Sequence, residues 1–421
     1  MGRHLSKFFA ILMLVLVYLP SAHAANAVQV AMDGRGVPFV LDNEGHVWAF
    51  RHPLNFGSSF KLPKLEHIKK IAPFVAVDDQ GRVFTWNFNE AKTKRDEGLV
   101  TEAAYTLPHR KEGLQGVTMV ASSIADAGNL NYLGIHYVAV IGNKEIVDWT
   151  VRQDTATGAV VSYGPIRKVI SREGVKAIAT ASWGGIIQPA TLSSPGVKDM
   201  ASSEVALFDD GTVMGWGINQ AGQTVTPEWS NTGMVLEEWD KMKAAAQKGV
   251  MITKSPGAID VAMDTGHIVI LTAKGIPQYW GGCAFRSYRY SPTLGVAKGA
   301  DGNIDDAVSM AVMSTYILSK YDYVDADLYI KKDGSLWVAY APSLPDVPDY
   351  CLGSTERTQK TWRVTLGTAP VVQISRYLAL DADHRVWMVG RMHQEVKGGV
   401  PPDPNAKFLL SPSREIQMDM N

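Results

Sequence analysis

Apolar and polar residues alternate along much of the chain in short runs that tight-turn signals interrupt. The clearest run is Glu204–Gln223, which reads EVALFDDGTVMGWGINQAGQ. Val205 and Leu207 alternate up to an Asp-Asp-Gly turn, and apolar residues resume at Val213. Alternation with a period of two on both sides of an Asp-Gly turn predicts a β-hairpin.

Six weaker copies of this pattern recur along the chain, at residues 39–50, 74–86, 137–149, 267–280, 326–340 and 377–390. The apolar position that aligns all seven copies is Val47, Val83, Ile146, Val213, Ile276, Leu336 and Val386, and neighbouring positions lie 36 to 67 residues apart. One hairpin cannot bury both of its faces, but stacked copies can bury each other. A self-similar unit of this length therefore predicts a propeller or a solenoid.

Several of the hairpins follow a short apolar run, as at residues 27–31, 68–72, 259–262 and 371–374. These runs predict at least three strands per unit, with room for a fourth. The expected fold is all-β: a seven-bladed β-propeller formed by residues 25–421 as a single domain. A long β-sandwich whose turns use Asp-Gly is the alternative. The tail, at residues 407–410 and 415–418, is expected to supply strands that pair with the first blade and close the ring.

The N-terminus has the pattern of an export signal. Arg3, His4 and Lys7 give a positive start, and Phe8–Leu19 is an unbroken apolar run that precedes the small residues Ala22-His23-Ala24. This arrangement predicts a signal peptide over residues 1–24 that is removed, which makes the protein periplasmic or secreted without later membrane insertion. A buried N-terminal helix is the alternative.

Composition adds little that is specific. The 421 residues are 46% hydrophobic and 20% charged, with a formal net charge of −1, which gives no electrostatic reason to expect a nucleic-acid partner. We expect a monomer. Cys283 and Cys351 follow the fifth and sixth hairpins, which would be neighbours in a ring, so they are candidates for a disulfide in an oxidising compartment. Two unpaired thiols are the alternative.

The best-preserved copy resembles the repeat of the regulator of chromosome condensation family, a family of seven-bladed β-propellers. The matching residues are Val205, Leu207, Gly211, Val213, Trp216, Gly217, Asn219, Gly222 and Gln223. The family's glycines and tryptophans are structural, so the resemblance carries over no active site. It implies a rigid disc that grips other proteins through loops, as an exported bacterial relative does when it inhibits β-lactamases.

Binding residues are expected where the copies depart from the repeat. Residues 228–249 have apolar positions three and four apart, which predicts a short helix inserted between the fourth and fifth blades and presenting Trp229 and Trp239. Residues 183–200 are predicted to form an irregular loop. Aromatic and arginine side chains often anchor interfaces, which makes a third segment with Arg286, Tyr288 and Arg289 a candidate binding site.

Catalytic and metal-binding motifs are not evident in the sequence. The histidines show no zinc spacing, and there is no nucleophile elbow or phosphate-binding glycine loop. We therefore predict no metal and no cofactor. The leading hypothesis is an exported, non-catalytic propeller that binds another protein. The alternatives are a protein that binds carbohydrate or cell-surface glycan, and a hydrolase or lyase with its site in the central channel.

Overall fold

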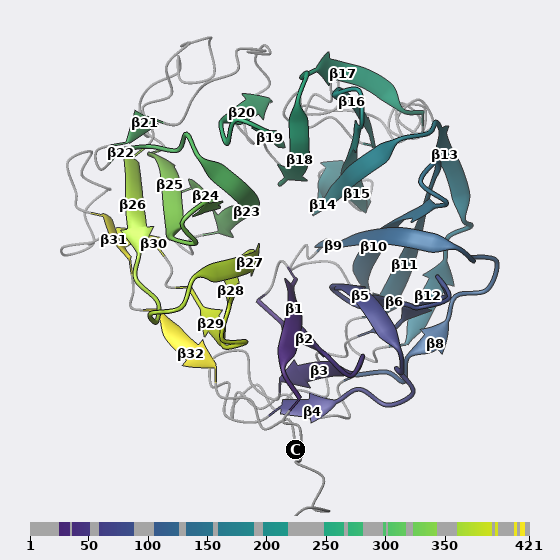
Figure 1. Ribbon diagram of the computed structural model, residues 1–421. Coiled ribbons are helices and arrows are strands. Elements are labelled where there is room, and N and C mark those ends of the chain that lie inside the picture. The colour runs from purple at the N-terminus through teal and green to yellow at the C-terminus, as the bar shows by residue number, and fades with distance from the viewer. Residues whose placement is uncertain are drawn as a thin grey trace, which may run out of the picture.

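Each aligned hairpin of the sequence forms the second and third strands of a separate antiparallel sheet in the computed structural model (Figure 1). The structure describes residues 25–33, 36–50, 59–87, 105–125, 132–154, 159–188, 197–217, 248–264, 268–280, 298–299, 302–316, 323–342, 360–389, 392–394, 408–410 and 413–416. Seven sheets of three to five strands lie in a ring within these residues, so the predicted seven-bladed propeller is confirmed. The described part of the chain contains no helix, and therefore none long and apolar enough to cross a membrane.

The first four blades follow one another along the chain. The first has β1 (Ala27–Met32), β2 (Pro38–Asp42), β3 (Val47–Phe50) and β4 (Ser59–Lys61). The second has β5 (Ile68–Ala72), β6 (Val75–Asp78), β7 (Val83–Thr85) and β8 (His109–Arg110). The third has β9 (Val117–Ala125), β10 (Tyr132–Ile141), β11 (Glu145–Asp154), β12 (Val160–Tyr163) and β13 (Arg167–Ser171). The fourth has β14 (Val175–Gln188), β15 (Val197–Phe208), β16 (Thr212–Gly217) and β17 (Val250–Lys254).

The remaining blades complete the ring. The fifth has β18 (Ala258–Met263), β19 (Ile268–Thr272) and β20 (Pro277–Trp280). The sixth has β23 (Ala307–Tyr316), β24 (Tyr323–Lys331), β25 (Leu336–Pro342) and β26 (Lys360–Val364). The seventh has β27 (Val371–Ser375), β28 (Leu378–Asp381), β29 (Val386–Met388) and β32 (Arg414–Ile416). Two further pairs are β21 (Lys298–Gly299) with β22 (Gly302–Asn303), and β30 (Met392–Gln394) with β31 (Phe408–Leu410).

The hydrophobic core lies between neighbouring blades. Six of the seven aligned apolar residues are at most 2% exposed, and Ile276 is half-buried. Three blades place a tryptophan three residues after the aligned position, and Trp86, Trp149 and Trp216 are fully buried. The large buried rings fill the wedge between one sheet and the next, which is the role that the repeat predicts for them.

The two faces of the ring differ. On one, which we call the turn face, the second strand of each blade turns into the third. The first strand of each blade is its inner strand, and at five of the seven junctions the first residue of the next inner strand donates to that turn. Ile68 N–H, for example, donates to the Gly45 carbonyl at 3.1 Å, and Val371 N–H donates to the Gly334 carbonyl at 2.8 Å. We call the opposite side the loop face. There the first strand connects to the second and the third to the fourth.

The turn glycine of the repeat has a clear structural reason. Gly211 has a φ of +80°, and a Cβ on it would lie 2.3 Å from the Ser255 carbonyl oxygen. In the seventh blade His384 replaces this glycine and still adopts a φ of +65°. Its Nδ1 lies 2.9 Å from the Ala27 carbonyl oxygen of the first blade. The substituted turn therefore helps to join the last blade to the first.

The ring closes differently from the prediction. The tail strand β32 pairs with β29 of the seventh blade, and β31 pairs with β30, so the expected pairing of the tail with the first blade is wrong. The two end blades instead pack together through Val30, Trp48, Leu380 and Ile416. Closure by side-chain packing needs no exchanged strand, because the seventh blade obtains its fourth strand from its own tail.

Candidate functional site

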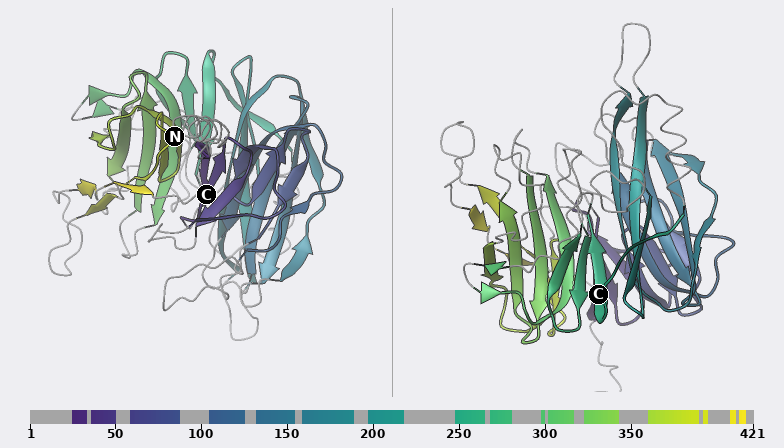
Figure 2. Two further views of the ribbon diagram at one scale, coloured as in Figure 1. Left: turned by 60° about the horizontal axis from the view of Figure 1, so that its bottom comes forward. Right: turned by 90° about the horizontal axis from the view of Figure 1, so that it is seen from above.

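Blades three and four extend on the loop face beyond their neighbours. All seven inner strands begin at the same position of the repeat, so differences in their length appear at the loop-face end. β14 has 14 residues and β9 has 9, whereas β5 and β18 of the neighbouring blades have 5 and 6; β23 of blade six has 10. At about 3.3 Å per residue, β14 extends roughly 30 Å further than β5. Figure 2 shows β14 and β15 rising above the other strands.

This extension corrects one prediction. Residues 183–200 were expected to form an irregular loop, yet β14 runs to Gln188 and β15 begins at Val197. Their register is continuous from Ala177 to Ile186, including Gly184-Gly185. Glycines weakened the alternating pattern, but backbone pairing does not depend on side chains, and the partner strand supplies the hydrogen bonds.

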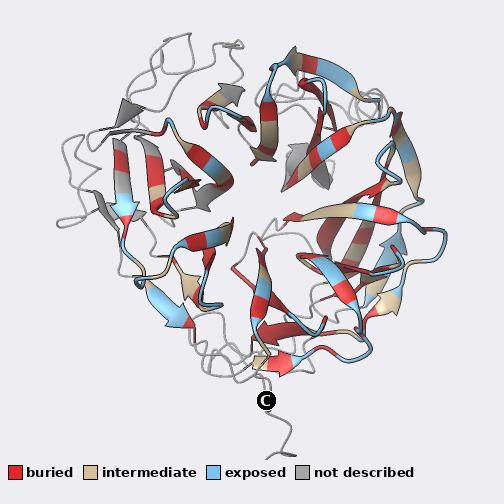
Figure 3. Cartoon of the chain, in the orientation of Figure 1, coloured by how far each residue is buried: buried red, intermediate tan, exposed pale blue. Residues whose placement is uncertain are grey.

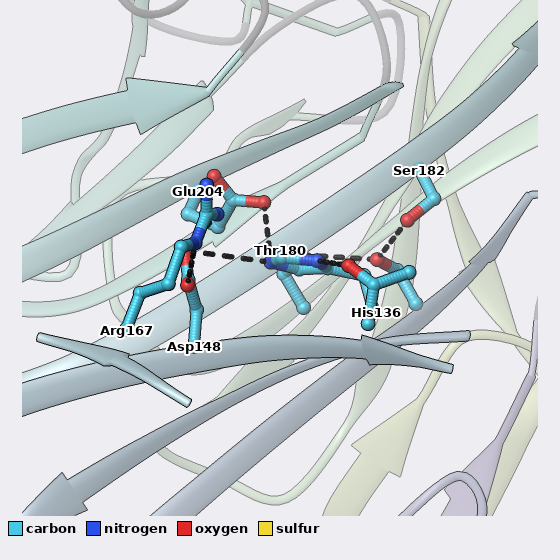
Figure 4. Close-up of polar contacts among 8 residues, drawn as sticks. His136, Asp148, Arg167, Thr180, Ser182 and Glu204 are labelled. Carbon is cyan, nitrogen blue, oxygen red and sulfur yellow. Dashed lines mark hydrogen bonds and ion pairs between the residues drawn. The ribbon is translucent and has the colours of Figure 1, made fainter. Parts of the chain in front are cut away.

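A buried network of charged and hydroxyl groups lies at the base of the extension, where blade three meets blade four (Figure 4). His136 on β10 places Nε2 2.8 Å from Glu204 Oε1 on β15 and 4.0 Å from Asp148 Oδ2 on β11. Arg167 on β13 donates from Nε and Nη2 to the two Asp148 oxygens, each at 2.8 Å. His136, Asp148 and Glu204 are at most 3% exposed.

Hydroxyl groups complete the network. His136 Nδ1 lies 2.9 Å from Thr150 Oγ1. On the inner strands, Ser123 Oγ of β9 lies 3.0 Å from Thr180 Oγ1 and 2.5 Å from Ser182 Oγ, both on β14. The hydroxyl contacts therefore join the same two blades as the ion pair.

The electrostatics favour a charged imidazole. Burial lowers the pKa of His136, but the carboxylates of Glu204 and Asp148 more than offset burial, so its pKa is raised above the usual value. With His136 protonated, two cationic and two anionic side chains balance. The Nε2–Oε1 contact is short, and neither atom has another hydrogen-bond partner among the described residues. Coulomb attraction to the Glu204 carboxylate raises the pKa of His136 more than the hydrogen bond to it does.

The network does not form an open metal site. His136, Asp148 and Glu204 could each offer one ligand atom, with these atoms within 4.8 Å of one another. However, His136 and Glu204 already touch, and Arg167 occupies both oxygens of Asp148. Asp42, Glu44 and His46 also cluster, but Asp42 accepts hydrogen bonds from its own turn and from Trp48 Nε1 at 2.8 Å. Both sets have the geometry of structural ion pairs.

The repeat makes room for this network at one glycine. Gly217, from the Trp-Gly pair of the fourth blade, has a φ of +84°. A Cβ on it would lie 2.4 Å from Glu204 Oε2 and 2.2 Å from the Ser202 carbonyl oxygen. A side chain at this position would therefore displace the Glu204 carboxylate.

Exposed apolar residues gather at the outer edges of blades two and three. We call Leu107, His109, Lys111, Val161 and Tyr163 the outer-edge patch. Leu107, Val161 and Tyr163 are 59%, 63% and 53% exposed. Tyr163 meets the His109 ring edge to face at 6.2 Å, and Lys111 Nζ lies 5.6 Å above the Tyr163 ring.

The chain geometry explains why this patch is exposed. β12 pairs with the loop-face half of β11, while β13 pairs with the other half. Val161 is the extra residue of a β-bulge in β12, so it has no partner across the strand pair. Lys111 Nζ also lies 5.9 Å from the buried Trp149 ring, which fixes the ammonium group between two aromatic rings.

The binding residues predicted from the sequence are not among the described residues. Trp229, Trp239, Arg286, Tyr288 and Arg289 fall outside the described residues. So do Cys283, Cys351, the predicted signal peptide and nearly all of the predicted helix over 228–249. These assignments stay predictions.

The sequence contained one signal that could have found the buried network. Glu204 occupies the repeat position that holds Phe74, Tyr137 and Tyr377 in three other blades, although Asp327 occupies it in the sixth. A carboxylate at a position that is often aromatic is a weak indication of a special contact. His136 and Asp148 give no comparable signal, because their partners come from other strands.

Comparisons with known proteins yielded structural similarity alone. No protein-family model matches the chain, and no curated protein sequence matches it. Prp20p from Saccharomyces cerevisiae, described with its binding to Gsp1p and histones, is 18% identical, with 70% of this chain and 68% of Prp20p covered and a TM-score of 0.41. Yeast RCC1 (Prp20) bound to Kap60 is 13% identical over 83% of this chain and 78% of its own, with a TM-score of 0.43.

A fucose-specific lectin from Aleuria aurantia is 9% identical, with 87% of this chain and 93% of the lectin covered and a TM-score of 0.40. At these TM-scores the fold assignment rests on the seven sheets themselves. The chain is a seven-bladed β-propeller whose third and fourth blades are joined by a buried ion-pair network and extend on the loop face.

Proposed function

We propose that this protein is a non-catalytic scaffold that binds a partner protein on the loop face, against blades three and four and the outer-edge patch. The observation that carries the proposal is the extension of β14 and β15 beyond the other strands on this face. A rigid pair of strands that projects from a disc offers a partner a surface that the short blades lack.

The outer-edge patch supports this proposal. Tyr163 combines a large exposed ring with a hydroxyl group, and Lys111 places a positive charge beside it. Aromatic and cationic side chains are the usual centres of binding energy in protein interfaces. Val161 on the same strand as Tyr163, and Leu107 just before β8, add exposed apolar surface.

The alternatives receive less support from the described residues. Trp86, Trp149 and Trp216 are fully buried, so they cannot serve as platforms for sugar rings. His136, Asp148 and Glu204 resemble a catalytic set in composition, but their burial keeps a substrate from reaching them. We retain the glycan-binding alternative as an outcome of the test. We also propose, from the N-terminal pattern, that the protein acts in the periplasm or outside the cell.

The experiment is affinity capture with the full chain, tagged and expressed in the organism that encodes it. Three variants are compared with the wild type. One replaces residues 184–200 by Asn-Gly, which joins the paired residues Trp183 and Ala201 by a two-residue turn. The second is Tyr163→Ser. The third, Val372→Ser on β27, removes a residue that is 55% exposed on the turn face of blade seven and serves as the matched control.

We expect the wild type and Val372→Ser to capture the same partner protein, and the other two variants to capture at least tenfold less of it. Capture that all four proteins share equally would overturn the proposal. Failure to capture any protein, together with binding to a glycan array, would instead support the carbohydrate alternative.

A further inference from the structure

The inner strands carry a second repeated feature, on the turn face. In each blade, the second residue of the inner strand is the extra residue of a β-bulge, where the register skips one position. The seven residues are Val28, Lys69, Thr118, Lys176, Ile259, Val308 and Val372. We call this set the bulge ring. Repeated bulges of this kind re-aim side chains at a rim.

One side of the bulge ring is apolar and exposed. Val308, Val372 and Val28 belong to blades six, seven and one, which are consecutive around the ring, and they are 47%, 55% and 43% exposed. Ile259 of blade five extends this arc and is half-buried. Figure 3 shows exposed segments on inner strands whose other described residues are buried or intermediate. Exposed valines at three equivalent places form a patch rather than scattered surface residues.

The neighbouring residues are already engaged between blades. Gln29 Oε1 accepts from Ile71 N–H at 3.0 Å, and Gln29 Nε2 donates to the Ile71 carbonyl at 2.9 Å. Gln373 Oε1 accepts from Val30 N–H at 2.9 Å. Lys70 Nζ donates to the Thr118 carbonyl at 2.6 Å. These contacts fix the positions of the inner strands, so the bulge ring is a preorganised surface.

The other side of the bulge ring is polar and basic. Lys69 and Lys176 are exposed on blades two and four, with Thr118 between them. Lys176 Nζ donates to the Ala258 carbonyl at 2.9 Å, which leaves further N–H groups for a ligand. Lys69 makes no ion pair with the described residues. Asp260 follows the bulge residue Ile259, and one of its oxygens accepts from Val261 N–H at 2.8 Å. Burial raises the pKa of Asp260, and the Lys176 ammonium partly offsets this rise.

We propose that the bulge ring binds the free C-terminal end of an extended partner chain. Apolar side chains of this segment pack on Val28, Val308 and Val372, and its carboxylate pairs with Lys69 and Lys176. The apolar arc and the two ammonium groups opposite it are complementary to a ligand that is apolar along its length and anionic at its end. This site lies on the opposite face from the partner surface proposed above and is independent of it.

The test uses a combinatorial library of pentapeptides with free C-terminal carboxylates, displayed on beads. The full-length wild type is the selecting protein, and Val28→Asp/Val372→Asp is the counter-selecting variant. Because both valines are exposed, the aspartates should leave the fold intact, and circular dichroism checks this. We expect enrichment of peptides with two or more apolar residues.

Affinities of the resynthesised peptides then decide the outcome by fluorescence anisotropy. Amidation of the C-terminus, Lys69→Gln and Val372→Ser should each weaken binding at least fivefold, whereas Met251→Ser should leave it unchanged. The proposal is overturned if no peptide is enriched, if amidation has no effect, or if the double aspartate variant binds the same peptides equally well. Capture of a protein by the loop face is unaffected by any of these results.

Discussion

Between the first and second blades, three aromatic rings form the contact. Phe39, Phe74 and Trp86 pack with centroids 5.1 to 6.3 Å apart, and all three are fully buried. Between the third and fourth blades, Glu204 takes the place that Phe74 has in the repeat and meets His136. The stability of an apolar contact changes little with small shifts of its side chains or with pH. A buried ion pair instead requires its charged atoms to lie close together and its groups to keep their charged forms.

The difference relates to the length of the strands. The aromatic interface joins blades with short inner strands, and the charged interface joins blade three to blade four, whose inner strand β14 is the longest described. A buried pair contributes little net stability, but it penalises any arrangement in which the charges separate. We infer that the charged interface fixes blade four against blade three at the base of the projecting strands.

The largest expected effect concerns the aromatic interface. Trp86→Ala should lower the free energy of unfolding by about 3–5 kcal/mol, because it removes a fully buried indole and leaves a cavity. Urea denaturation measures the change. Trp387→Ala is the control, since this indole is half-buried and should cost less. Equal losses in the two variants would contradict the account.

The second prediction concerns the charged interface. Glu204→Ala should lower the free energy of unfolding by about 3 kcal/mol, because it leaves a buried imidazolium without its partner. Glu145→Ala breaks an exposed pair with Lys168 and should cost less than about 1 kcal/mol. A loss at Glu204 as small as that at Glu145 would show that the buried pair does not form.

The third prediction uses pH to separate the two interfaces. Because the pKa of His136 is raised in the folded protein, its pairing contributes fully below the unfolded value of about 6.5 and is lost as the pH rises through the folded value. Stability should therefore fall from pH 6 towards alkaline pH in the wild type. The fall should be smaller in His136→Gln and unchanged in Trp86→Ala. Parallel curves of unfolding free energy against pH for the wild type and His136→Gln would contradict this prediction.

The smallest expected effect concerns the contacts around the axis. Gln29→Ala removes two hydrogen bonds to Ile71 and should cost about 1 kcal/mol, and Gln373→Ala should cost less because it removes a single bond to Val30. Thermal unfolding of the two variants beside the wild type measures the order. A larger loss in Gln373→Ala would indicate that closure of the ring depends on that contact.

The fold was predictable because each copy of the repeat contains the alternating pattern and turn of one hairpin. The aligned positions from Val47 to Val386 gave seven hairpins, and each became the centre of a blade. Ring closure was not predictable, since β32 and an inner strand have similar short apolar patterns and sequence does not distinguish their partners. The extension of β14 was missed because Gly184-Gly185 breaks the alternation.

The candidate site was less predictable for a related reason. His136, Asp148, Arg167 and Glu204 come from four strands, and tertiary packing alone brings them together. Tyr163 lies on β12, which follows no repeat column and therefore gave no signal. Departures from the repeat directed the binding-site prediction to residues 228–249 and 286–289, and not to the four residues of this network.

The most direct measurement is hydrogen–deuterium exchange of the protein alone and in complex with its captured partner. The account predicts new protection in β12, β14 and β15, on the loop-face side of blades three and four, while the outer strands of the other blades stay unchanged. Protection confined to blades one and seven, or spread evenly over all seven blades, would contradict the assignment of the partner surface.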